Sequence, residues 1–178
     1  NITLPAFDWK AMAAKTEEQP VWVHFGAGNI FRGFIAALQQ KLLNEGLCES
    51  GIVAAETFDY DIITKIHEPH DSMTLMVALK PDGSTDMEVI ASIAKGVRAC
   101  SAEADQWAQL KKIFENPSLQ FASFTITEKG YALRGMNGDL MGVVTADIAD
   151  GPDKARHAMS VVAAMMYYRF LAGAAPMA

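Results

Sequence analysis

The sequence predicts an α/β fold, a doubly wound and mostly parallel sheet with an inserted β-hairpin. An apolar strand pattern at 21–25 runs directly into two glycines, Gly26 and Gly28, and a helical pattern follows at once. A buried strand pattern at 51–56 comes next, and a similar one lies at 119–126. Strand, glycine turn, helix and strand within about 36 residues form a βαβ unit, whose two strands are parallel.

The elements of the N-terminal part follow from hydrophobic spacing and glycine placement. Residues 1–20 are mixed in character and are expected to be a lead-in segment before a domain at 21–178. Apolar residues recur at helical spacing over 29–43, at positions 31, 34, 35, 38, 42 and 43. Gly46 is placed to end this helix in a left-handed cap. A short helix is predicted over 59–67.

Strand patterns at 73–79 and 88–94 flank a turn at 80–84, which predicts the inserted hairpin. A helix is expected over 101–115. Beyond the strand at 119–126 we expect a long loop. Pro152 is well placed as the first residue of a last helix, which runs to about residue 171 and ends at Gly173.

The composition excludes several classes of function. The chain is 51% hydrophobic and 20% charged, as globular proteins are, and its net charge of −6 offers no basic surface to a nucleic acid or an anionic membrane. Cys48 and Cys100 are far apart and form no metal-binding spacing, which favours a reduced, cytoplasmic protein. His67 and His70 are three residues apart rather than four, and Pro69 between them breaks the helical face that a metal would need, so we expect no metal site here. No signal peptide or membrane span is recognised.

The turn at Gly26-Ala27-Gly28 predicts a bound dinucleotide. Glycines let the backbone approach phosphates, and the N-terminus of the following helix favours negative charge. Glu56, at the end of the next strand, could accept hydrogen bonds from the ribose hydroxyls of NAD and would repel the 2′-phosphate of NADP. The simpler alternative is a turn that only connects strand to helix.

Three residues beside the turn have alternative interpretations. Phe31 stands where such turns usually have a third glycine, which implies a wider helix–strand contact or a differently placed first turn. Arg32 could reach a phosphate or a substrate anion, or equally be a solvated surface arginine. His24 is more simply packed between strand and helix than catalytic.

A polar loop follows the strand at 119–126 and begins Thr127, Glu128, Lys129. Ligands of open α/β sheets bind outside the carboxyl ends of the strands, so this loop should lie near the glycine turn. We expect it to contact the nicotinamide half of the cofactor or the substrate.

With these motifs the chain resembles the long-chain mannitol dehydrogenase family, whose members oxidise polyols and hexonates. The resemblance rests on Val-His-Phe-Gly-Ala-Gly-Asn-Ile-Phe-Arg-Gly-Phe at 23–34, Thr-Glu-Lys-Gly-Tyr at 127–131, the hairpin ending in Ile-Ala-Ser-Ile at 90–93, and a last helix closed by Ala-Gly-Ala-Ala-Pro at 172–176. Polyol and hexuronate members typically show Gly-x-Gly-x-Phe-His-Arg-Ala-His, of which only Arg32 matches after the glycines. This turn looks more like that of the related mannitol-1-phosphate 5-dehydrogenases, whereas the inserted hairpin and the Thr-Glu-Lys-Gly-Tyr loop favour the larger polyol and hexuronate group.

The resemblance implies a Rossmann domain that binds NAD in a metal-independent dehydrogenase for a sugar alcohol or sugar acid. The pyrophosphate would be held by Gly26, Gly28, Asn29, Ile30, Phe31 and Arg32, the adenosine ribose by Glu56, and the nicotinamide half by Thr127, Glu128 and Lys129. The resemblance also implies that the general-base lysine belongs to a helical C-terminal domain absent from this chain, so no catalytic residue is expected within it.

Two other functions stay open from the sequence. A methyltransferase that uses S-adenosylmethionine also has a glycine turn and an acidic residue after its second strand. A nucleotide-sensing module without catalytic activity would need no downstream lysine.

Overall fold

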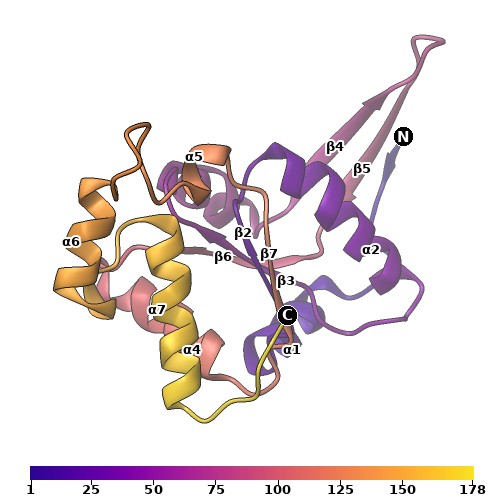
Figure 1. Ribbon diagram of the computed structural model, residues 1–178. Coiled ribbons are helices and arrows are strands. Elements are labelled where there is room, and N and C mark those ends of the chain that lie inside the picture. The colour runs from indigo at the N-terminus through magenta and orange to yellow at the C-terminus, as the bar shows by residue number, and fades with distance from the viewer.

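The computed structural model describes residues 1–178, and a four-stranded parallel sheet forms its centre. The strands are β2 (Trp22–Phe25), β3 (Ile52–Glu56), β6 (Ile93–Arg98) and β7 (Phe121–Phe124), in the order β6-β3-β2-β7. Each neighbouring pair is parallel (Figure 1). The predicted α/β fold is therefore confirmed.

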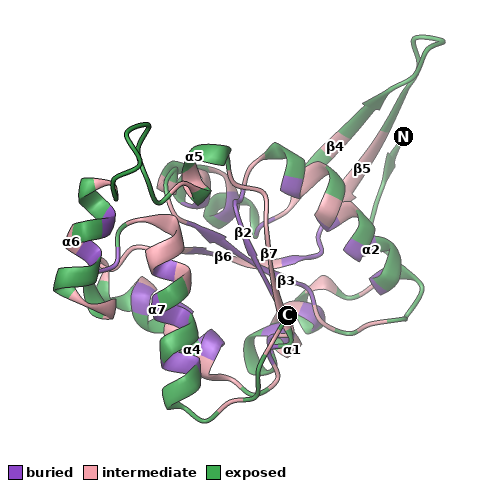
Figure 2. Cartoon of the chain, viewed as in Figure 1, coloured by how far each residue is buried: buried purple, intermediate pink, exposed green.

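Helices cover both faces of this sheet, as the alternation of side chains along its strands requires. One face carries Val53 and Ala55 of β3 and packs against α4 (Ala104–Glu115) and α7 (Ala158–Leu171). The opposite face carries Ile52 and Ala54 and packs against the helix that follows the glycine turn and the segment after β3. Figure 2 shows the central strands as the most buried part of the molecule.

A second sheet of three strands holds the predicted hairpin. β4 (Thr74–Leu79) and β5 (Thr85–Ile90) are antiparallel, and β1 (Ile2–Thr3) pairs with β5 in parallel. The hairpin extends away from the body of the molecule (Figure 1).

The predicted strand at 88–94 is wrong, because it joins parts of two strands. β5 ends at Ile90 and β6, a strand of the central sheet, begins at Ile93. At the crossing, Ser92 accepts from Ile52 N at 2.9 Å and donates to the Ala36 carbonyl at 2.5 Å. The two intervening residues remain apolar or small, so nothing in the pattern marks the change of sheet.

Residues 1–20, expected as a lead-in, contain β1 and the helix α1 (Trp9–Glu18). Asp8 caps this helix by accepting from two backbone N–H groups, Lys10 and Ala11. Buried Thr16 accepts from Gly51 N at 2.8 Å, which joins α1 to the start of β3. This segment is therefore packed against the rest of the fold.

The helix expected over 29–43 is interrupted by a π-helical turn. Phe31–Ile35 form this turn and α2 (Ala36–Asn44) follows. The wider turn places Phe31 and Ala36, five residues apart, on the buried face, whereas an α-helical pattern predicts spacings of three and four. The predicted apolar face is consequently wrong at Phe34, Leu38 and Leu42, which are 63%, 48% and 43% exposed.

The ends of the helices follow their local signals more closely. Gly46 has φ +68°, and Leu47 N donates to the Leu42 carbonyl at 2.9 Å, as predicted for a left-handed cap. Gly173, with φ +70°, likewise ends α7. The short helix expected over 59–67 is present as α3 (Tyr60–Ile62) and a second π-helical turn to His67.

The last third of the chain contains more helix than expected. α5 (Glu128–Tyr131) and α6 (Gly142–Asp150) lie in the predicted loop, and α7 begins only at Ala158. Pro152 starts a separate 3-10 turn, so the prediction that it begins the last helix is wrong. Asp147 of α6 accepts from the backbone N–H groups of Arg156 and His157, and these bonds join α6 to the residues just before α7. Every helix is too short or too polar to cross a membrane.

Candidate functional site

The carboxyl ends of β2, β3 and β7 meet at a cavity of about 740 Å³. This volume lies within the range of sites for small molecules and cofactors. Its walls come from the glycine turn, the segment after β3, the loop after β7 and the start of α7. The lining residues are Gly26, Gly28, Glu56, Thr57, Phe58, Ile62, Thr125, Ile126, Thr127, Lys129, Gly130, Val143, Arg156, His157 and Ala158.

The two glycines of the turn have different reasons to be glycine. Gly26 has φ +105°, and a Cβ there would lie 2.7 Å from the carbonyl oxygen of Thr125, the residue that follows β7. A side chain is therefore excluded by both backbone conformation and close approach. Gly28 has no positive φ, and a Cβ would meet no atom within 4 Å. Its side toward the cavity is open to a ligand.

Glu56 lies at the end of β3 and is 7% exposed. Its Oε2 accepts from Ala27 N at 2.9 Å, and its Oε1 accepts from the N–H groups of Thr57 and Phe58 at 2.9 and 3.0 Å and of Asp59 at 3.4 Å. The carboxylate thus fastens the glycine turn to the segment after β3. Because a carboxylate oxygen has two lone pairs, Oε2 retains one acceptor position.

Phe31 and His24 form the packing behind the turn. Both are fully buried, and their rings stack with centroids 4.3 Å apart at an interplanar angle of 6°. The expectation that His24 is packed between strand and helix is confirmed. The Phe31 side chain points into the core, so only its backbone could contribute to a ligand site.

Arg32 lies in the first turn after the glycines and forms no ion pair with a carboxylate. Its Nη2 donates to Asn29 Oδ1 at 2.5 Å, and its buried Nε has no partner. Burial lowers the pKa of the guanidinium from its ordinary value. A partly buried cation without a counter-ion can pair with an anion that enters from outside.

The loop after β7 was expected to contact a ligand, and two of its three predicted residues line the cavity. Thr127, Glu128 and Lys129 are all exposed, at the start of the single turn α5. Thr127 and Lys129 line the cavity, whereas Glu128 does not. The loop therefore lies beside the glycine turn, as the parallel sheet requires. Asn29, Ile30 and Arg32 follow Gly28 in the chain but do not line the cavity.

The sequence did not single out several lining residues, among them Thr125, Arg156 and His157. Arg156 is tied to Asp147 at 2.8 Å and also pairs with Asp150, so its charge is neutralised within the protein. His157 caps α7, its Nδ1 accepting from Met159 N at 3.2 Å. The available signal for Thr125 was its position at the carboxyl end of a predicted strand, but no sequence signal placed the start of α7.

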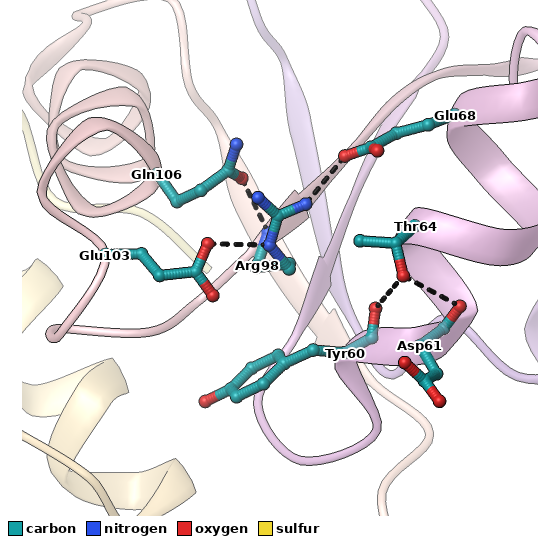
Figure 3. Close-up of polar contacts among 7 residues, drawn as sticks. All are labelled: Tyr60, Asp61, Thr64, Glu68, Arg98, Glu103 and Gln106. Atoms are coloured by element: carbon teal, nitrogen blue, oxygen red, sulfur yellow. Dashed lines mark hydrogen bonds and ion pairs between the residues drawn. The ribbon is translucent and has the colours of Figure 1, made fainter.

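The end of β6, the remaining strand of the central sheet, is braced by its last residue, Arg98 (Figure 3). Its guanidinium donates to Glu68 at 2.6 Å and to Glu103 at 2.8 Å, and its backbone N donates to Gln106 at 2.9 Å. These contacts join β6 to the segment after β3 and to α4. They brace the elements beside the cavity without entering it. No three His, Cys, Asp or Glu side chains lie close enough together to hold a metal ion.

Comparison with known proteins gives a consistent result. Residues 20–178 match the family described as the mannitol dehydrogenase Rossmann domain. The chain is 46% identical over 178 residues to a D-mannonate oxidoreductase of Thermotoga maritima, covering all of this chain and 33% of that protein. An uncharacterised oxidoreductase of Escherichia coli, YeiQ, is 28% identical over 141 residues, covering 79% of this chain and 28% of that one.

Two solved structures share the fold. D-sorbitol dehydrogenase in substrate-free form superposes with a TM-score of 0.80 at 24% identity, over 99% of this chain and 35% of that chain. Mannitol 2-dehydrogenase of Pseudomonas fluorescens, in a ternary complex with NAD and D-mannitol, superposes with a TM-score of 0.80 at 22% identity, over the same shares. The chain thus spans about a third of the length of these relatives.

Proposed function

The chain belongs to the mannitol dehydrogenase family, and from this premise we propose that it is the NAD-binding domain of a dehydrogenase for polyols or hexonates. The observation that carries the proposal is the cavity where β2, β3 and β7 end, with an open glycine on one side and a buried carboxylate on the other. Dinucleotides bind at this position in doubly wound sheets.

The residues present fit the cofactor. A Cβ at Gly28 would project into free space, so the backbone there can be approached closely. Arg32, without a carboxylate partner, can balance the charge of a pyrophosphate together with the N–H groups that follow the turn. The remaining acceptor position on Glu56 Oε2 suits a ribose hydroxyl and disfavours a 2′-phosphate, which supports NAD over NADP.

The proposed reaction is hydride transfer between the cofactor and a secondary alcohol of a sugar acid or sugar alcohol. When bound, NAD supplies the hydride acceptor at C4 of the nicotinamide. Thr127 and Lys129 line the cavity, and we propose that they flank the nicotinamide half. The 46% identity to a D-mannonate oxidoreductase makes the mannonate–fructuronate pair the first substrate to test, and mannitol–fructose the second. We propose that the proton-abstracting lysine lies in the two thirds of the relatives that this chain does not cover.

A titration of the protein with NADH, followed by nicotinamide fluorescence, tests the proposal. We expect saturable binding that is stronger than binding of NADPH and that is lost in Gly28→Val. Gly142→Val is the matched control, because Gly142 also has free space around its Cβ position but does not line the cavity. Equal binding by wild type and Gly28→Val, or preference for S-adenosylmethionine over NADH, would contradict the proposal.

A further inference from the structure

A row of hydrogen bonds crosses from β2 to β7 beneath the cavity. Trp22 Nε1 donates to Ser123 Oγ at 2.6 Å, and Ser123 Oγ lies 2.7 Å from His24 Nδ1. His24 Nε2 lies 2.8 Å from Thr125 Oγ1, and that hydroxyl donates to the Gly26 carbonyl at 3.4 Å. The row alternates between the two strands and ends at the first glycine of the turn.

The first donor determines the direction of every following bond. An indole N–H can only donate, so Ser123 Oγ accepts from Trp22 and has its own proton to give. The acceptor within reach is His24 Nδ1, which assigns the imidazole proton to Nε2. Nε2–H then donates to Thr125, whose hydroxyl proton is left for the Gly26 carbonyl. With the other tautomer the Ser123 proton would have no acceptor in the row.

The hydrogen bonds at position 24 require an imidazole, whereas packing against the core does not. His24 is 0% exposed, and the stacking against Phe31 could be provided by any flat apolar ring. Only a ring with an acceptor on one edge and a donor on the other joins the two hydroxyls without leaving either unsatisfied.

We propose that His24 is a positioning residue for the cofactor, because its neutral imidazole directs the Thr125 hydroxyl to the Gly26 carbonyl and thereby holds the glycine turn in its binding conformation. The inference rests on the proposed function. In this proposal Thr125, which lines the cavity, holds the turn from the side of β7.

The turn is then held from both sides. On the β3 side, Glu56 Oε2 accepts from Ala27 N at 2.9 Å. On the β7 side, Thr125 closes so near to Gly26 that a Cβ would lie 3.1 Å from its Oγ1. A turn that is already ordered loses little conformational entropy when a pyrophosphate binds. Loosening either side should therefore reduce the affinity for NADH.

Two substitutions of His24 separate this role from simple packing. In His24→Asn the shorter amide can accept from Ser123 but cannot reach Thr125, whereas in His24→Gln the amide nitrogen reaches the position of Nε2 and can donate to Thr125. We expect NADH affinity to fall about tenfold in His24→Asn, as for one lost buried hydrogen bond, and to stay within about threefold of wild type in His24→Gln.

Thr125 provides an independent pair of variants. Thr125→Val removes the hydroxyl at nearly constant volume, and Thr125→Ser keeps it. We expect Thr125→Val to weaken NADH binding about tenfold and Thr125→Ser to bind within about threefold of wild type. Unfolding midpoints measured on all four variants report the fraction of folded protein in each titration. In the wild type, ¹⁵N shifts of the His24 ring should show Nε2 protonated.

The outcomes are distinct. If wild type binds NADH and both asparagine and glutamine variants weaken it equally, or neither does, the positioning role is overturned. A His24 ring protonated at Nδ1 would also overturn it. If the folded wild type does not bind NADH at all, the proposed function itself fails, and the positioning role fails with it.

Discussion

Gly26→Ala should destabilise the fold strongly, because two separate penalties act at this residue. Its φ of +105° lies in a region that residues with a Cβ rarely adopt, which costs about 1–3 kcal/mol. The new Cβ would also stand 2.7 Å from the Thr125 carbonyl oxygen, 3.1 Å from its carbonyl carbon and 3.1 Å from its Oγ1. Two of these atoms are backbone atoms of the residue that follows β7, which cannot rotate away as a side chain can, and such overpacking costs about 1–3 kcal/mol more.

The expected loss is therefore about 2–6 kcal/mol in the free energy of unfolding, a large share of the total stability of a domain of this size. Urea unfolding followed by circular dichroism measures it. Gly28→Ala is the matched control, because it adds the same methyl group where no atom lies within 4 Å. We expect the control to change stability by less than about 0.5 kcal/mol. Equal stability of Gly26→Ala and the control would refute the claim that close approach of β2 and β7 requires glycine here.

Two further predictions concern buried cations and bases. Burial lowers the pKa of both His24 and His67 to about 4, so between that value and their ordinary pKa of 6.5 the unfolded chain binds more protons than the folded one. The free energy of unfolding should therefore fall as the pH is lowered from 7 to 5, by at most about 2.7 kcal/mol per pH unit; urea unfolding across this range that shows no pH dependence would contradict the prediction. Arg169 is 2% exposed and donates to the carbonyl groups of Phe114, Asn116, Leu119 and Ala175. Arg169→Lys keeps the charge but cannot reach four acceptors, and it should lower the thermal unfolding midpoint by the equivalent of about 2–4 kcal/mol. Arg134→Lys, exposed and bonded only to Gly138, should leave the midpoint nearly unchanged.

Features that depend on neighbouring residues could be predicted from the sequence. The caps at Gly46 and Gly173 need a left-handed residue at the end of a helix, and glycine adopts that conformation without strain. The strands that end at Phe25 and Glu56 are short apolar runs next to a turn. Each of these signals lies within a few residues of the structure that it predicts.

Features that depend on the partner across the fold could not be predicted. Ala91 and Ser92, both small and buried, carry the chain from one sheet to another without a turn signal such as glycine or proline. The π-helical turn at Phe31 shifts the buried face and accompanies the stacking of its ring on His24, a contact between distant residues that helical periodicity does not predict. The helix α6 is placed by the bonds of Asp147 to Arg156 and His157, which follow it in the chain.

By itself the sequence determined a glycine turn between parallel strands, an acidic residue at the next strand end and the family that carries both, because these are local patterns. The tertiary structure decided how the site is built around them. It turned Glu56 toward the backbone of the turn and brought Thr125 against Gly26. It also joined His24 to Thr125 across 101 residues of chain. Hydrogen bonds between distant segments depend on the register of the sheet, and that register exists only once the strands have paired.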